Sequence, residues 1–299
     1  MGLTDWGVAG AVVFLSSLLL FGMPHGAVDH YVFFRLRGQE LTMLRVLVFC
    51  FFYLGLGGVM FLVWQASPVL GVWGFVLLTW WHWGEGDVIY HASRGGRPAL
   101  FFALWRGALP MVLPVLLHPE AYVRVLEAAL RASGSDNFDA VRWVSGESAR
   151  LALACLVAVL GAVNWCVLLQ QFWACSSLKR LALEDVALVL FLLLSEPLLG
   201  VGCYFMFWHS LRHIIVSTPL LAYGERRSTH TNWMFFYSRA WPLTVGGILL
   251  LVLYHFWARQ NMTDVFAWIG SYFVILWSLT WPHAVICHLF KKDLLMRAV

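Results

Sequence analysis

Long apolar runs separated by short polar stretches dominate this chain. The runs predict nine helical spans, at residues 8–24, 42–64, 69–90, 98–117, 148–172, 182–199, 200–221, 239–258 and 265–289. A helix needs about 20 residues to cross a hydrocarbon core of about 30 Å. The first span reaches that length only if its helix continues past Pro24, and merging the two spans that meet near Gly200 gives eight. We therefore expect an all-α, polytopic transmembrane bundle of about eight or nine helices, formed by residues 1–299 as a single domain.

The composition agrees with a membrane protein. Of the 299 residues, 61% are hydrophobic and 12% are charged, and the mean hydropathy is +0.76. A closed barrel would alternate apolar and polar residues, and these spans do not. The net charge of +4 reflects the loops, so we expect a lipid bilayer and no nucleic acid as partner. Most Lys and Arg residues fall on one side of the nine-span arrangement, which predicts an external N-terminus and a cytoplasmic C-terminus in the cell membrane.

The longest polar interruption is residues 118–147. Apolar residues between Tyr122 and Leu130 recur at helical spacing, which predicts a helix lying along the outer interface, and the following "SGSDN" predicts a turn. A connector is the simpler interpretation of this segment, and a lid is the alternative. The six cysteines lie in or near the ends of spans and lack CxxC spacing, so we expect small core residues, neither disulfides nor a zinc site.

Histidines inside the apolar spans are the candidate chemistry. Seven of the 11 occur in four motifs: His25 and His30 in "GMPHGAVDH", His82 in "TWWHWGEGD", His209 and His213 in "WHSLRH", and His283 and His288 in "WPHAVICH". Ionisable groups at bilayer depth are costly and usually functional. His209 and His213 are four residues apart and so share one helix face. Five of these histidines lie at similar depths, about 14 to 27 Å from the outer end of their spans: His25, His82, His209, His213 and His283. One metal centre could therefore contain them all.

The remaining histidines are weaker candidates. His30 lies about 140° around a helix from His25, which makes it a poorer ligand, and His288 falls at the inner end of its span. The other four are expected to be ordinary structural residues: His91, His118, His230 and His255.

The ligand type alone does not select the metal. No cysteine is found at ligand spacing from the histidines, which argues against a thiolate zinc site, and imidazole suits Fe, Cu, Zn and Ni. Two histidines with a carboxylate, from Asp29 or Asp87, form an alternative ligand set. We expect instead that Asp29 orients a histidine, and that Glu85 or Asp87 does the same for His82.

Two further side chains near these motifs need an explanation. Trp83, beside His82, could line an apolar channel for a long, rigid hydrophobic substrate, although ordinary aromatic packing would look the same. Arg212 lies between His209 and His213 and needs an acidic or carbonyl partner. Its candidate partners are Asp29, Glu85, Asp87 and Glu196.

Taken in order, the four motifs resemble those of the Brp/Blh family of membrane β-carotene 15,15′-dioxygenases, across nearly the whole chain. The resemblance implies cleavage of the central double bond of β-carotene by O₂ to give two molecules of retinal. It also implies a cofactor, Fe(2+), held by the catalytic residues His25, His82, His209 and His213, with His283 near the metal or the substrate channel. The family's second motif commonly reads "WHFGxxD", and Trp83 takes the aromatic position here, which leaves the preferred carotenoid open. Since retinal is the chromophore of rhodopsins, a rhodopsin is the implied recipient.

Two other classes of protein stay open. "HGAVDH" and "HSLRH" also resemble the histidine boxes of membrane hydroxylases and desaturases that act on a carotenoid or lipid, but the HxxHH box of that family is absent. A haem-binding or transport protein would also place histidines within the membrane.

Overall fold

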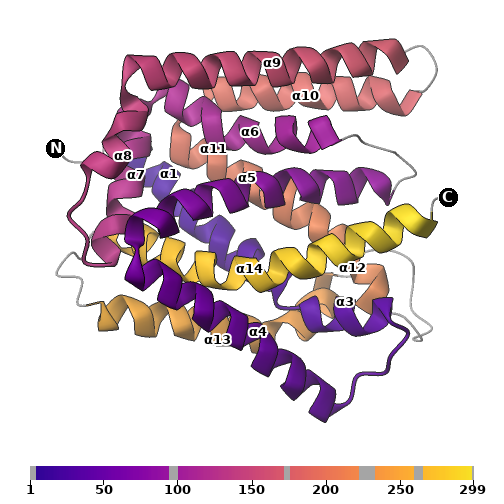
Figure 1. The fold of residues 1–299 in the computed structure, drawn as a ribbon. Coiled ribbons are helices and arrows are strands. Elements are labelled where there is room, and N and C mark those ends of the chain that lie inside the picture. Colours follow the sequence, from indigo (N-terminus) through magenta and orange to yellow (C-terminus); the bar gives the residue numbers. More distant parts are fainter. Residues whose placement is uncertain (1–4, 94–99, 172–175, 222–232, 259–264, 298–299) are drawn as a thin grey trace.

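The structure is a computed structural model that describes residues 5–93, 100–171, 176–221, 233–258 and 265–297. Across these ranges the regular elements are all helical (Figure 1). Six described helices are long and apolar enough to cross a membrane: Val8–Leu36, Met43–Ala66, Leu100–Leu117, Glu147–Leu169, Trp233–Trp257 and Val265–Leu294. The all-α class is therefore confirmed, whereas the expected count of eight or nine spans is not.

The first apolar span is longer than its pattern suggested, because the helical path continues past Pro24. It comprises α1 (Asp5–Ser17), a π-helical segment η1 (Leu18–Gly22), α2 (Met23–Gly26) and, after a turn, α3 (Asp29–Leu36). Proline has no N–H with which to continue the α-helical ladder, and here it is the second residue after the wider π turn. The path carries His25 and Asp29 into the interior.

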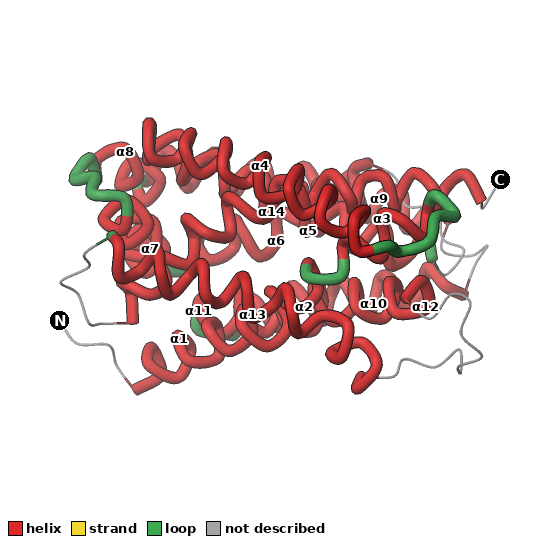
Figure 2. The backbone as a smooth tube through the Cα atoms, turned by 90° about the horizontal axis from the view of Figure 1, so that it is seen from below, coloured by secondary structure: helices red, strands yellow, loops and turns green. Residues whose placement is uncertain are grey.

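Most of the other helices run side by side between the two ends of a bundle, whereas α7 and α8 lie at one end (Figures 1 and 2). These other helices are α4 (Met43–Ala66), α5 (Pro68–Ala92), α6 (Leu100–Leu117), α7 (Pro119–Ala132), α8 (Asp139–Arg142), the 3₁₀ turn η2 (Trp143–Ser145), α9 (Glu147–Gln171), α10 (Ser176–Leu194), α11 (Pro197–Cys203), the π-helical η3 (Tyr204–Ser210), α12 (Leu211–Leu221), α13 (Trp233–Trp257) and α14 (Val265–Arg297). Helices α5 and α14 lie inside, α9 and α10 form one edge, and α4 and α13 form the opposite edge (Figure 1).

The expected boundary at Gly200 is wrong by a few residues. Helix α10 ends at Leu194 and α11 begins at Pro197, with Gly200 inside α11. The side chain of Glu196 accepts a hydrogen bond from the backbone N–H of Leu199 at 3.0 Å, and proline is well suited to the first helical turn. The cap and the proline therefore set the start of the helix, which then continues through η3 to Leu221.

The segment after α6 forms the predicted helix, α7, at one end of the bundle (Figure 1). Its apolar face is buried and packs against α14, where Gly270 lies so close to the backbone of Ala128 that a Cβ atom would collide with it. The expected turn follows, with Gly134 at a φ of 73°. The segment therefore covers one end of the bundle, and its place at the outer interface stays a prediction.

Glycines bring α5 and α6 into close contact. A Cβ at Gly84 would collide with the carbonyl of Ala103, and one at Gly107 would collide with the carbonyl of Trp80. Small residues allow membrane helices to approach closely, so that packing and hydrogen bonds hold them together. This contact fixes the position of α5, which carries His82.

Candidate metal centre

Five buried histidines converge in the interior. They are His25 on α2, His82 on α5, His209 on η3, His213 on α12 and His283 on α14. Each of them is only 3–5% exposed. The candidate ligand atoms of four of them, His25, His82, His209 and His283, all lie within 4.8 Å of one another. A second group by the same measure consists of His213, His283 and Cys287, so His283 belongs to both groups.

The rings of these histidines surround a common point. The ring centroid of His25 lies 5.1 Å from that of His209 and 4.7 Å from that of His283. The ring centroid of His82 lies 4.8 Å from each of the same two. His213 is slightly farther out, with ring centroids 5.4 Å from His25 and 5.3 Å from His283. The structure thus places His213 beside the four most compact rings and brings His283 among them.

Two irregular helical turns help to aim the ligand-bearing residues. His209 lies within the π-helical η3, and His25 follows shortly after the π-helical η1. Such turns shift the side-chain phase along a helix and are frequent at functional sites. Helix α5 approaches closely here, since a Cβ at Gly86 would lie 3.1 Å from Nδ1 of His209.

Hydrogen bonds fix the orientation of two of the rings. The carboxylate of Asp29 lies 2.8 Å from Nδ1 of His283 and also accepts a hydrogen bond from the hydroxyl of Tyr53 at 3.0 Å. Nδ1 of His25 lies 3.2 Å from the carbonyl of Phe21. With Nδ1 donating, the Nε2 atoms of both rings are left available to a metal, and this is a common arrangement of metal-bound histidines.

Several ring nitrogens are buried without a hydrogen-bond partner. These are Nε2 of His25, Nδ1 of His82, both nitrogens of His209 and Nε2 of His213. A buried polar atom without a partner costs about 1–3 kcal/mol, so such atoms are rare unless an ion or water satisfies them. Metal–nitrogen bonds of about 2.0–2.1 Å place opposite ligands about 4 Å apart, so a small contraction of the cluster brings it into coordinating range. The residues therefore fit a metal ion.

The carboxylates expected to orient His82 are engaged elsewhere. Glu85 accepts hydrogen bonds from Lys291 and from His288, the latter at 3.0 Å. Asp87 pairs with Arg106 at 2.6 Å and with Arg212 at 2.8 Å. The expectation that Glu85 or Asp87 orients His82 is therefore wrong.

A buried charge network joins the ligand-bearing helices to their neighbours. Arg212 pairs with Asp87, which was one of its four candidate partners, and with Glu184 at 2.7 Å, which was not. Arg106 is fully buried and pairs with Asp87, with Glu184 and with Asp185, the last at 2.7 Å. This network ties α5 and α12 to α6 and α10, and apart from the adjacent Glu184 and Asp185 its members lie far apart in the sequence.

One cysteine lies beside the cluster, contrary to the sequence expectation. The Sγ atom of Cys287 is 3.5 Å from Nε2 of His283 and 4.0 Å from Nδ1 of His213. Cys287 is four residues after His283 on α14, so the helical spacing was an available signal. The other described cysteines are free thiols, but Cys155 and Cys166 are exposed on the surface of the bundle, so the expectation of core residues is wrong for these two.

Among the remaining histidines, His255 behaves as a structural residue. Its ring stacks on Trp268 with centroids 3.7 Å apart and hydrogen-bonds to Ser271 at 3.0 Å. His30 is buried but belongs to neither group of candidate ligands. The prediction for His230 lies outside the described residues.

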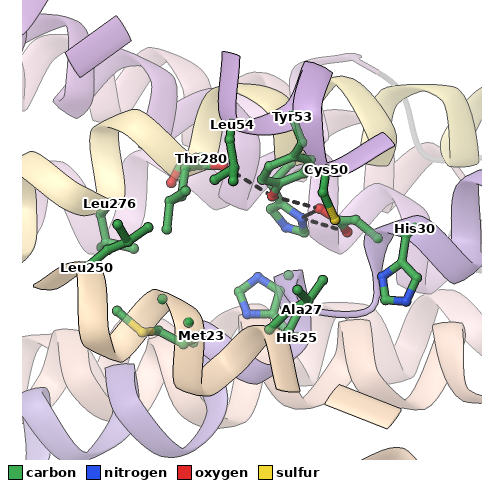
Figure 3. Close-up of a pocket in the computed structure, with 18 of the residues that line it drawn as sticks. Met23, His25, Ala27, His30, Cys50, Tyr53, Leu54, Leu250, Leu276 and Thr280 are labelled. Carbon is green, nitrogen blue, oxygen red and sulfur yellow. Dashed lines mark hydrogen bonds and ion pairs between the residues drawn. The ribbon is translucent and has the colours of Figure 1, made fainter. Parts of the chain in front are cut away.

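An apolar cavity adjoins the cluster, and a second one lies beside Trp83. One, of about 370 Å³, has His25, Asp29, Tyr53 and His283 among its lining residues, and most of its remaining wall is apolar (Figure 3). Trp83 lines a separate, smaller cavity of about 100 Å³, and its ring centroid is 5.8 Å from that of His209. The cluster can therefore meet a hydrophobic molecule without leaving the protein interior.

A match to a family model over most of the chain shows the family to which the protein belongs. A family model described as β-carotene 15,15′-dioxygenase matches residues 16–291, a range that includes all five clustered histidines. The chain belongs to this family. The Brp/Blh resemblance of the four motifs is thereby confirmed.

Two relatives carry related names. The chain is 31% identical to a probable β-carotene 15,15′-dioxygenase of Halobacterium salinarum, over 91% of this chain and 81% of the relative. It is 23% identical to a β-carotene 15,15′-dioxygenase of an uncultured marine bacterium, over 95% of this chain and 93% of the relative. No solved structure matches this member of the β-carotene 15,15′-dioxygenase family.

Proposed function

We propose that the protein cleaves the central 15,15′ double bond of β-carotene with O₂, giving two molecules of retinal, and that Fe(2+) is its cofactor. The observation that carries this proposal is a buried cluster of histidines that borders an apolar cavity, in a chain of this family. A hydrocarbon substrate needs such a water-poor site, and the histidines supply the ligands for a metal that reacts with O₂.

The proposed iron ligands are His25, His82 and His209, together with His213 and His283. The motif resemblance supports His213, and the short distances to the other rings support His283. Imidazole is a suitable ligand for iron.

Iron, when bound, would supply the ability to react with O₂; the protein's own residues position and protect the reactants. Asp29 holds the Nδ1 proton of His283 and so leaves Nε2, which also contacts the thiol of Cys287, without a proton of its own. The apolar walls exclude water and hold the polyene with its middle beside the histidines. Both atoms of O₂ end as the two aldehyde oxygens, so the overall reaction needs no proton donor, acceptor or reductant.

We further propose nine membrane crossings, with the N-terminus outside and the C-terminus in the cytoplasm. Helix α1 begins and α14 ends at opposite ends of the bundle, which supports an odd number of crossings (Figures 1 and 2). The bilayer would supply the carotenoid, and a rhodopsin would receive the retinal.

Expression in a bacterium that makes β-carotene tests the activity. We expect the wild-type protein to bleach the orange cells and produce retinal. Replacing His25 or His209 by Ala should abolish both retinal formation and iron retention, whereas His255→Ala, which alters a buried histidine outside the cluster, should retain iron. Intact β-carotene in cells that contain folded, iron-loaded wild-type protein would reject the proposed reaction.

Iron content also tests the ligand set and the nuclearity. We expect one iron per chain, and a loss of iron in both His213→Ala and His283→Ala. Full iron retention in either variant would remove that histidine from the ligand set, and two irons per chain would favour a di-iron hydroxylase.

A further inference from the structure

Two neighbouring apolar cavities lie on one side of the histidines. The first contacts His25 and His283, and the second, of about 700 Å³, lies between α4, α13 and α14. Both are lined by Leu54, Leu250 and Leu279, so they meet at these three side chains. We call the two cavities together the α4–α13 groove.

The histidines border the groove away from either of its ends. In Figure 3, His25 lies between the side that carries Leu250 and Leu276 and the side that carries Cys50 and His30. His25 is 5% exposed, and its Nε2 atom has no hydrogen-bond partner. A molecule that fills the groove therefore passes the candidate metal centre and extends in both directions.

Aromatic side chains close one end of the groove. The ring centroid of Phe61 lies 5.7 Å from that of Tyr254 and 6.4 Å from that of Trp257. Beyond them, Gln65 donates a hydrogen bond to the hydroxyl of Tyr254 at 3.4 Å, which links α4 to α13. The hydroxyl of Tyr53 donates a hydrogen bond to the carboxylate of Asp29, which holds His283. Phe61 follows Tyr53 by eight residues on α4, so the two lie about 12 Å apart along the helix. The groove thus has a wall at a fixed distance from the centre.

The long sides of the groove are smooth and open to the bilayer. A Cβ atom at Gly58 on α4 or at Gly246 on α13 would meet no other heavy atom within 4 Å. Leu54, Leu250 and Leu253 line the groove and are 52%, 41% and 57% exposed, so its rim faces outward from the bundle. Flat walls and a lateral opening suit a long, stiff, flat hydrocarbon that is already dissolved in lipid.

We infer that the α4–α13 groove is the polyene-binding site, that the substrate enters it sideways from the bilayer, and that Gly58 and Gly246 keep it open. This inference rests on the proposed function for the identity of the polyene. One half of β-carotene extends towards Phe61, Tyr254 and Trp257, which stop its ring and place the central double bond beside His25 and His283.

Blocking the groove from either wall tests the inference. In Gly58→Phe and Gly246→Phe the new ring enters open space, so the helices need not move, and helix propensity does not fall. The matched control is Gly55→Phe, since Gly55 is also exposed on α4 with open space at its Cβ but is absent from the lining of either cavity. Gly246→Leu supplies a smaller obstruction should the larger ring disturb folding.

Two quantities are measured for each variant. The first is the β-carotene that co-purifies with metal-free protein, from its absorbance per mole of monodisperse protein, and the second is the retinal formed by iron-loaded protein. We expect both to fall by about tenfold or more in the two groove variants, because a steric clash opposes the ligand directly. Iron content and the behaviour of Gly55→Phe should stay at the wild-type level.

The outcomes separate this inference from the proposed function. Wild-type levels of bound β-carotene in Gly58→Phe and Gly246→Phe, or an equal loss in Gly55→Phe, would overturn the groove assignment even if the wild-type protein forms retinal. A third outcome is that wild-type protein binds β-carotene and Gly246→Phe does not, while wild-type protein forms no retinal. This outcome would support the groove and reject the proposed reaction.

Discussion

Replacing Asp29 by Asn tests whether a carboxylate holds His283 as a metal ligand. Asp29 is 1% exposed, and its carboxylate lies 2.8 Å from Nδ1 of His283 and 3.0 Å from the hydroxyl of Tyr53. Asn preserves the size of the side chain but removes the negative charge that makes the histidine a stronger ligand and fixes its tautomer. The change therefore acts on the metal through one ring and does not remove a ligand.

The size of the expected effect follows from this arrangement. Loss of an outer carboxylate partner lowers metal affinity by about 10–100-fold. At about 1.4 kcal/mol for each factor of ten, this corresponds to about 1.4–2.8 kcal/mol of binding free energy. The loss of a ligand such as His25 should be more severe, with no retained iron.

The assay is iron retention by purified protein during titration with a competing chelator, measured by elemental analysis. Glu85→Gln is the matched control, because Glu85 is also 1% exposed and also bonds a histidine of α14, His288, which lies outside the cluster. We expect Asp29→Asn to release iron at about 10–100-fold lower chelator concentration, and Glu85→Gln to follow the wild type. Unchanged iron affinity in Asp29→Asn, or an equal loss in Glu85→Gln, would refute the assignment of His283 as a ligand held by Asp29.

Two further predictions concern the scaffold around the centre. Arg106→Met leaves its three carboxylate partners without their shared cation, so we expect a loss of about 3–5 kcal/mol in the free energy of unfolding, measured in detergent or bicelles. An unchanged unfolding free energy would show that the network does not stabilise the fold. Gly107→Leu places a side chain against the carbonyl of Trp80 and should separate α5 from α6, lowering both thermal stability and iron retention. Wild-type stability in Gly107→Leu would contradict the close packing of these helices.

The individual motifs could be recognised from sequence because their signals are local. An imidazole such as His82 within an apolar run is conspicuous, and the spacing of His209 and His213 places them on one helix face. The helical pattern between Tyr122 and Leu130 likewise predicted α7. Such signals depend only on residues within a few turns of each other.

The contacts between helices could not be predicted in the same way. Asp29 bonds His283 across 254 positions, and Glu184 pairs with Arg212 on a different helix. The π-helical segments η1 and η3 also alter the direction in which the following side chains point, and the apolar pattern does not reveal them. These features depend on how each helix is rotated and how closely it approaches its neighbours.

The sequence by itself determined that the chain is helical and strongly apolar, and it identified the histidines that stand out within those helices. Only the tertiary structure decided that His283 lies among the most compact rings, that Cys287 borders them and that an open groove runs past them. The physical reason is that periodicity specifies which side chains share a face of one helix, whereas the meeting of several faces depends on packing between helices that are distant in sequence.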